Sequence, residues 1–212
     1  MPIGDSIFHI THLDNVPGLI GRGGFDCDRT VSAFGGPTVV IGMSELKGRR
    51  FGIPVPMHSP LSVGDFVPFY FCPRSVMLYV IYCANHPDLA YKGGQDPIAH
   101  FRFDLDAVIS WADDESQRWA FTLQNATSAY ADFRASRYEL ELVNWNAVGS
   151  TSWSPPAIKD GKQAEFLVES FVPLSLVAEI GVKDINALDA VESMFDGSPF
   201  RPRVSVRRDW YY

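Results

Sequence analysis

One carboxylate in this sequence stands where apolar side chains are expected. Glu165 lies near the start of "KQAEFLVESFVPLSL", residues 162–176, a stretch that is mainly apolar. Strand alternation would place Glu165, Leu167 and Glu169 on one face, with Phe166 and Val168 on the other. The face with Glu165 could simply be exposed to solvent, or Glu165 could form a structural ion pair. Alternatively, Glu165 could lie at the floor of a cleft. In a cleft, it would stabilise developing positive charge or accept a proton. Periodicity does not separate these interpretations.

A histidine and a threonine near the N-terminus form a second candidate. In "IFHIT", His9 and Thr11 are two residues apart in an alternating, β-branched run, so a strand points both to the same face. They could bond a polar ligand together, with the backbone of Ile10 free to bond an amide. A buried histidine beside a strand threonine is the commoner arrangement, and the motif taken alone favours it.

A third candidate is the aromatic and polar segment "VPFYFCPRSVMLY". Tyr70, Ser75 and Tyr79 could frame a flat ring, with the serine hydroxyl bonding an amide. Aromatic residues in a strand are usually core, and the segment taken alone favours that interpretation. Arg74 is harder to bury without a partner.

Two adjacent arginines, Arg49 and Arg50, form the fourth candidate. Adjacent arginines most often lie on a solvated surface. The planar, permanently charged guanidinium nevertheless suits a pyrophosphate.

Composition limits the classes of protein to consider. The 212 residues suffice for one well-packed domain, and 46% hydrophobic with 20% charged residues is ordinary for a globular chain. A net charge of −7 argues against a broad DNA-binding surface but leaves a local basic groove possible. The three cysteines and five histidines lack metal-ligand spacing, so we expect no metal. We also expect no membrane segment and no secretory signal, and a cytoplasmic location.

The elements that must position these residues follow from periodicity and chain breakers. We predict strands at 7–11, 65–72, 97–103, 118–123 and 164–171. We predict helices at 13–25 (Asp14 or Asn15 near the N-cap, glycines from Gly21 ending it), 75–84, 104–111 (begun by Asp104), 129–142 and 173–180. Residues 24–65 are expected to be mostly irregular, and Pro68 suggests an edge or entry position in its strand. Without a regular βαβ repeat, we expect an α+β fold with an antiparallel or mixed sheet.

Several motifs together resemble one family. "IFHITHLDNVPGLI", "VPFYFCPRSVMLY", "GGQDPI", "KQAEFLV" and "VRRDWYY" occur in the same order as in the DarT family of DNA ADP-ribosyltransferase toxins. The resemblance is weakest over residues 21–47 and 104–160. It implies a single ADP-ribosyltransferase domain over 1–212, with two facing, mostly antiparallel sheets that form an NAD-binding cleft flanked by helices. It also implies transfer of ADP-ribose from NAD to a base of single-stranded DNA, with thymine favoured.

The resemblance also implies roles for residues of this sequence. Glu165 and Arg50 match the catalytic pair, with Arg49 as a second choice because a one-residue shift is possible in this loop. The positions matching the NAD site are His9, Ile10, Thr11, Tyr70, Ser75 and Tyr79. The loop 149–164 falls where this fold places target recognition. Where some relatives have histidine, this chain has Asn125, which bonds but does not titrate.

Partners and alternatives complete these expectations. Composition points to side chains for contact with DNA, and the candidates are Trp145, Trp153, Tyr130, Asn125 and Arg74. The family implies a macrodomain antitoxin similar to DarG as a partner. Two other hypotheses stay open. The same fold could act on guanine, RNA or protein, or the chain could be a catalytically silent nucleic-acid-binding domain.

Overall fold

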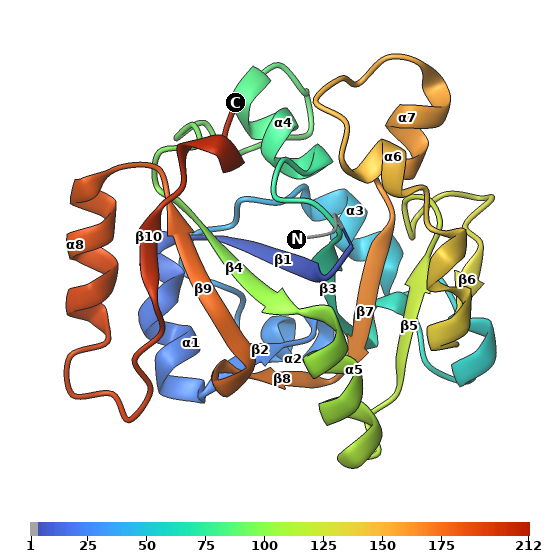
Figure 1. The fold of residues 1–212 in the computed structure, drawn as a ribbon, viewed down its shortest axis with the longest axis horizontal. Helices are drawn as coiled ribbons and strands as arrows, with labels where there is room; N and C mark the ends of the chain where they lie inside the picture. The colour runs from blue at the N-terminus through green and yellow to red at the C-terminus, as the bar shows by residue number, and fades with distance from the viewer. Residues whose placement is uncertain (1–3) are drawn as a thin grey trace.

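A central eight-stranded sheet organises the protein, whose computed structural model describes residues 4–212 (Figure 1). Its strands lie in the order β10-β9-β4-β1-β3-β7-β5-β6, and β2 and β8 form a separate small sheet. All neighbouring strands pair antiparallel except β9 and β10. The strands are β1 (Ser6–His12), β2 (Gly24–Asp26), β3 (Phe66–Tyr70), β4 (Ile98–Asp104), β5 (Trp119–Thr122), β6 (Phe133–Arg134), β7 (Glu165–Glu169), β8 (Phe171–Pro173), β9 (Val177–Val182) and β10 (Val204–Val206). The predicted α+β class is confirmed.

The large sheet is nearly divided between β1 and β3. β1 pairs with β4 along its whole length, from Ser6↔Asp104 to His12↔Ile98, but with β3 only at Phe8↔Tyr70. The two expected sheets are therefore two four-stranded halves joined at one point. The prediction of an edge or entry position for Pro68 was wrong, because it is the middle residue of β3, which pairs on both sides. The carbonyl of Pro68 faces β1, and so would its missing N–H, which helps to explain why the pairing stops there.

Short helices surround the sheet, and local capping explains where several begin. They are α1 (Val16–Arg22), α2 (Asp28–Ala33), α3 (Ser44–Arg50), α4 (Val76–Cys83), α5 (Leu105–Asp114), α6 (Trp145–Val148), α7 (Pro156–Gly161) and α8 (Ile185–Met194). Asp104 caps α5 by accepting a hydrogen bond from the Ala107 amide at 2.8 Å, as predicted. Ser75 caps α4 through the Leu78 amide at 3.2 Å. Gly23 follows the last residue of α1 with a φ of 76°, a left-handed conformation that glycine adopts at low cost because it has no side chain.

Three segments differ from the sequence-based expectations. The helix predicted at 129–142 is instead a loop, the short β6 and a 3-10 helix at Arg137–Leu142. This segment exposes Tyr130 and Tyr138 and has no continuous apolar stripe with which an α-helix could pack. The helix predicted at 173–180 is a short 3-10 turn followed by β9, whose residues are needed between β4 and β10. The segment 24–65, expected to be irregular, contains α2 and α3.

The core between the large sheet and the small β2–β8 sheet is rich in aromatic rings. Phe25 of β2 makes edge contacts with Phe101 and Phe103 of β4, at ring-centroid distances of 5.0 and 5.5 Å. This packing fixes β2, and with it the start of α2, against the half of the sheet that contains β1. Within residues 4–212, no helix combines the length and the apolar character needed to cross a membrane.

Candidate active site

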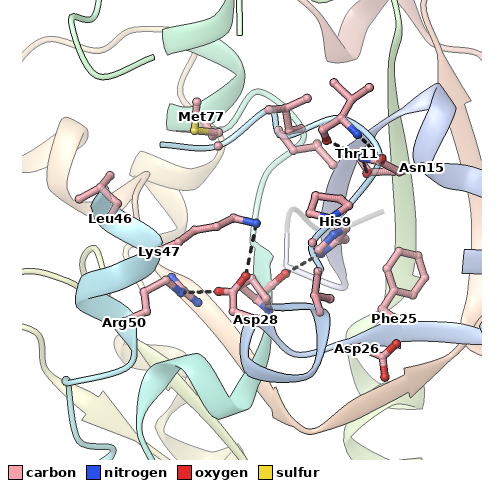
Figure 2. Close-up of a pocket in the computed structure, with 18 of the residues that line it drawn as sticks. His9, Thr11, Asn15, Phe25, Asp26, Asp28, Leu46, Lys47, Arg50 and Met77 are labelled. Atoms are coloured by element: carbon pink, nitrogen blue, oxygen red, sulfur yellow. Dashed lines mark hydrogen bonds and ion pairs between the residues drawn. The ribbon is translucent and has the colours of Figure 1, made fainter. Parts of the chain in front are cut away.

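A cavity of about 340 Å³ opens at the split between β1 and β3 (Figure 2). Its walls come from β1, α1, α2, the loop 34–43, α3, β3 and the first residue of β7. Residues far apart in the sequence meet here for two reasons. β1 and β3 pair at only one position, and the segment 24–65 folds over the gap that this leaves.

Glu165 and Arg50 form a buried ion pair on the wall of this cavity. Glu165 begins β7 directly opposite Tyr70 of β3, and its side chain turns back toward the split. Arg50 donates from Nη1 to Glu165 Oε2 at 2.8 Å, and the Ala126 amide donates to Oε1 at 3.0 Å. Glu165 is only 3% exposed. Its carboxylate is therefore oriented by two donors before any ligand binds.

Asp28 holds the other side of the Arg50 guanidinium. Arg50 Nε lies 3.1 Å from Asp28 Oδ2, and Lys47 Nζ lies 3.6 Å from Asp28 Oδ1 (Figure 2). Burial alone would lower the pKa of Arg50, but the carboxylates of Glu165 and Asp28 outweigh it and keep that pKa above its usual value. Arg50 Nη2 is buried and has no hydrogen-bond partner within residues 4–212.

His9 occupies the split itself. Its Nδ1 lies 2.9 Å from the Pro68 carbonyl oxygen, and its ring packs edge-on against Phe25 with centroids 4.9 Å apart. Burial lowers the pKa of His9, although the bond to Pro68 opposes this effect, so the ring is neutral near pH 7. A neutral ring that donates from Nδ1 leaves Nε2 as an acceptor.

Asn15 fastens the loop 34–43 at the cavity. Its amide donates from Nδ2 to the Val39 carbonyl at 2.9 Å and accepts from the Val39 amide at 2.8 Å. Nδ2 also donates to Thr11 Oγ1 at 3.0 Å. One side chain thus ties β1 to the loop, which lines the cavity through residues such as Val39 and Ile41.

Comparison with known proteins supplies an independent line of evidence. The family described as "ssDNA thymidine ADP-ribosyltransferase, DarT" matches residues 8–212. The chain belongs to the DarT family.

Relatives of this DarT-family chain match it over nearly their whole length. It is 35% identical to a DNA ADP-ribosyl transferase of Thermus sp. (strain 2.9), over 97% of this chain and 95% of the relative. The structure of Thermus sp. 2.9 DarT in complex with ADP-ribosylated single-stranded DNA superposes with a TM-score of 0.88, at 34% identity, covering 100% of this chain and 98% of that one. The NAD⁺ complex of the same Thermus protein gives 0.83 at 33% identity, covering 99% and 98%.

The structure brings most of the residues predicted for the site to one cavity. Those that line it are His9, Ile10, Thr11, Arg50, Tyr70, Asn125 and Glu165. Arg49 does not: its side chain is 60% exposed and pairs with Glu45 at 2.7 Å on the outer face of α3. Of the two adjacent arginines, only Arg50 is in contact with Glu165.

Other residues predicted for the NAD site lie outside the cavity wall. Ser75 is fully buried and its hydroxyl caps α4. Tyr79, one turn further along, stacks on Trp153 with ring centroids 5.4 Å apart. Neither side chain lines the cavity.

The residues predicted to contact DNA are dispersed. Trp145 packs edge-on against Phe71 and donates to the Leu140 carbonyl, so it belongs to the core. Tyr130 is exposed on the turn after Asn125, and Arg74 lies over the Tyr212 ring at 4.3 Å. Asn125 Oδ1 accepts from the Thr127 amide at 2.8 Å, which leaves its Nδ2 group as a donor.

Sequence reasoning missed three polar residues of the site. Asp28 and Lys47 lie in the segment taken as irregular, and Asn15 was interpreted as a helix cap. The signal that could have found Lys47 is the cationic run "KGRR" at residues 47–50, whose spacing of three places Lys47 and Arg50 on one side of a helix. Nothing local marks Asp28.

Proposed function

We propose that residues 1–212 act as a single-domain, NAD-dependent ADP-ribosyltransferase that modifies thymine in single-stranded DNA. The observation that carries this proposal is the buried Arg50–Glu165 pair on the wall of the cavity. Family membership supports it, as does the similarity to a Thermus protein whose structures hold NAD⁺ and ADP-ribosylated single-stranded DNA.

The cavity suits a dinucleotide. Its volume of about 340 Å³ lies at the lower end of ordinary ligand pockets, and it is partly open to solvent. Arg50 and Lys47 supply positive charge for a diphosphate, and Phe25 and Met77 are among the apolar residues available to flat rings. Within residues 4–212 no cluster of side chains could hold a metal ion, so in this proposal all the positive charge comes from side chains.

Glu165 has two tasks in the proposed reaction. When the bond between nicotinamide and ribose breaks, positive charge develops on the ribose carbon, and a nearby carboxylate stabilises it. The thymine ring nitrogen then forms the new bond to that carbon, and its proton must leave. Glu165 is the acceptor we propose for this proton. Asp28 also pairs with Arg50, but of the carboxylates in residues 4–212 that line the cavity only Glu165 lies on β7.

Arg50 and Asn125 have positioning roles in this proposal. Arg50 holds Glu165 through Nη1, and its guanidinium on the cavity wall supplies positive charge for a phosphate. Asn125, next to the Ala126 amide that bonds Glu165, offers its Nδ2 group to a base or ribose oxygen. Because an amide does not titrate, acid–base chemistry rests on Glu165.

The biological setting is part of the same proposal. A DNA-modifying DarT-family enzyme is toxic to its own cell unless the modification is reversed, so we place it in a toxin–antitoxin pair with a DarG-like macrodomain antitoxin. A cytoplasmic location is part of the proposal, because the proposed substrates, NAD and DNA, are found there.

The test is direct. Incubation with NAD and thymine-containing single-stranded oligonucleotides should increase their mass by one ADP-ribose unit, and thymine-free oligonucleotides should stay unchanged. Glu165→Gln should lower the rate by ~10²–10³-fold, the usual effect of removing a preorganised charge. Modification of guanine-only DNA, RNA or protein instead would refute the thymine assignment. An unchanged rate in Glu165→Gln would refute the catalytic one.

A further inference from the structure

Four aromatic side chains outside the cavity form a continuous group, which we call the aromatic series: Trp153, Tyr79, Tyr212 and Tyr82. Trp153 and Tyr79 stack at 5.4 Å, and Tyr82 and Tyr212 stack at 5.6 Å, both with 25° between the ring planes. Tyr79 joins the two pairs through an edge contact with Tyr212 at 5.2 Å. Three separate parts of the chain therefore contribute to one aromatic surface.

The aromatic series is held in place on one side only. Trp153 Nε1 donates to the Tyr212 hydroxyl at 2.8 Å, and that hydroxyl donates to the Arg74 carbonyl at 2.9 Å. Tyr82 lies at the end of the series and is 55% exposed. An exposed tyrosine stacked on a fixed ring presents a rigid apolar face to solvent, where a further ring could bind at low entropic cost.

Two cations accompany these rings without an acidic partner. The Arg74 guanidinium lies 4.3 Å from the centroid of the Tyr212 ring, and Lys162 Nζ lies 5.1 Å from that of Trp153. Neither forms an ion pair with an acidic side chain of residues 4–212, and the same is true of Lys92, Lys159, Arg203 and Arg208. Arg74 and Lys162 are thus uncompensated positive charges beside aromatic rings, in a chain whose net charge is −7.

The aromatic series shares elements with the proposed active site. Met77 lines the cavity from α4, the helix that also carries Tyr79 and Tyr82. Trp153 belongs to the loop before α7, and α7 leads into β7 and Glu165. Figure 1 shows α4, α7 and the C-terminal end on the same side of the molecule. Lys162 Nζ, which donates to the Ser150 carbonyl at 2.7 Å, fastens that loop.

We propose that the aromatic series binds the single strand on one side of the target base, with a flanking base stacked on Tyr82 and a phosphate facing Arg74. Stacking on aromatic rings together with backbone charge is the general mode by which proteins bind single strands without reading each base. This inference rests on the proposed function, because it concerns the same substrate. It adds a second contact region, outside the cavity, that controls affinity for DNA and leaves NAD chemistry unchanged.

Steady-state kinetics on oligonucleotides of different length test this proposal. The variant is Tyr82→Ala, compared with the wild type on a trinucleotide centred on thymine and on oligonucleotides extended to about 12 nucleotides on the 5′ or the 3′ side only. On the extension that crosses the aromatic series, we expect KM for DNA to rise about fivefold or more, the effect of losing one stacked base. KM for NAD, kcat and the trinucleotide reaction should stay within about twofold. Tyr82→Phe should behave as wild type, because it keeps the ring.

Controls separate this role from a general effect of removing a tyrosine. Tyr138→Ala removes a tyrosine that is 90% exposed on a different element and should change none of these constants. Arg74→Gln should make the dependence of log KM on log salt concentration shallower by about 0.7, the value for one phosphate contact on a single strand.

The outcomes distinguish the two proposals. If the wild type modifies DNA but Tyr82→Ala leaves KM unchanged on both extended oligonucleotides, the aromatic series does not bind DNA and the proposed function stands. If the wild type has the same KM for the trinucleotide and for both extended oligonucleotides, the aromatic series likewise does not bind DNA and the proposed function stands. If the wild type modifies no oligonucleotide of any length, the proposed function itself fails.

Discussion

At the scale of single residues, the arrangement around Arg50 decides what the cavity can do. A buried guanidinium between two carboxylates, Glu165 and Asp28, has its charge compensated and its direction fixed. Removing Arg50 would leave the buried carboxylate of Glu165 without its cation, and removing Glu165 or Asp28 would leave the charge of Arg50 less compensated, so each loss is destabilising. The rate of Glu165→Gln is therefore measured together with its thermal unfolding, and a substitution that keeps the charge avoids this cost.

The adjacent arginines provide a matched pair of variants. Arg50→Lys keeps a cation but loses the planar fork that reaches both Glu165 and a ligand, so we expect the transfer rate to fall by ~10²-fold. Arg49→Lys changes an exposed residue paired with Glu45, and its rate should stay within about twofold of wild type. The measurement is the rate of ADP-ribose transfer to an oligonucleotide by each variant. Thermal unfolding of both variants checks that they are folded. Equal effects of the two substitutions would contradict the assignment of Arg50.

At the scale of elements, the side-chain hydrogen bonds that tie the loop 34–43 to the start of α1 all come from Asn15. Asn15 makes three hydrogen bonds, two to Val39 and one to Thr11, and each is worth roughly 1 kcal/mol. Without them, the loop has no side-chain hydrogen bond to β1 or α1 within residues 4–212, and the contact of the Arg22 guanidinium with the Phe34 ring at 4.3 Å still joins it to α1.

Asn15→Ala should therefore act on NAD binding more than on chemistry. We expect KM for NAD to rise about tenfold, corresponding to roughly 1.4 kcal/mol, with kcat nearly unchanged because Glu165 and Arg50 stay in place. Asp14→Ala, at the exposed neighbouring position, is the control. A loss confined to kcat would show that the loop does not bind NAD.

The entry to β3 is a second element whose stability has a defined cause. Ser62 and Asp65 form a capping box, with the Ser62 amide and hydroxyl donating to Asp65 Oδ2 at 2.8 and 2.7 Å. Arg29 also donates to Asp65, and this bond, together with those from Ser62, lowers the Asp65 pKa to about 2.

This lowered pKa gives a prediction for acid unfolding. Because the folded pKa lies below the unfolded value of 3.8, Asp65 stabilises the fold above pH ~4, and this contribution is lost as the pH falls toward 2. We expect about 1 kcal/mol, reduced by solvent screening because the Arg29 side chain is 53% exposed. Asp65→Asn should lower the free energy of unfolding at pH 7, and the gap from wild type should narrow between pH 4 and 2. A gap that is independent of pH would mean that the charge of Asp65 is not responsible.

At the scale of the whole molecule, the C-terminal segment closes the fold against β9. Trp210 packs directly over Gly181, so that a Cβ built there would lie 2.2 Å from the indole ring. The Tyr211 hydroxyl bonds the carbonyls of Ile98 and Gly181, joining this segment to β4 as well as β9. Figure 1 shows the C-terminal end beside β10 and α4, so the same closure positions Tyr212 in the aromatic series.

Two glycine substitutions measure this closure. Gly181→Ala should destabilise the protein by about 1–3 kcal/mol, because the added methyl group displaces the Trp210 ring. Gly21→Ala, in α1 with open space around it, should be neutral or stabilising by up to about 1 kcal/mol. Chemical denaturation of both variants provides the comparison. If Gly181→Ala unfolds at the same denaturant concentration as wild type, Trp210 is not packed there.

The sequence alone determined the local elements and the class of the protein. Alternation predicted β1 and the shared face of His9 and Thr11, the Asp104 cap predicted the start of α5, and the combined motifs identified the family. These features depend on residues a few positions apart or on motifs whose order survives in the sequence. The prediction of a helix at 129–142 was wrong, because the conformation of this segment depends on packing partners elsewhere in the chain.

Only the tertiary structure decided which polar residues meet. That Arg50 rather than Arg49 contacts Glu165, that Asp28 and Asn15 line the same cavity, and that Tyr79 lies outside it all follow from how residues 24–65 and α4 pack around the split sheet. The decisive contact, Arg50 to Glu165, joins residues 115 positions apart. A contact of that separation is fixed by strand order and by the break in pairing at Pro68, and no local spacing in the sequence encodes either of them.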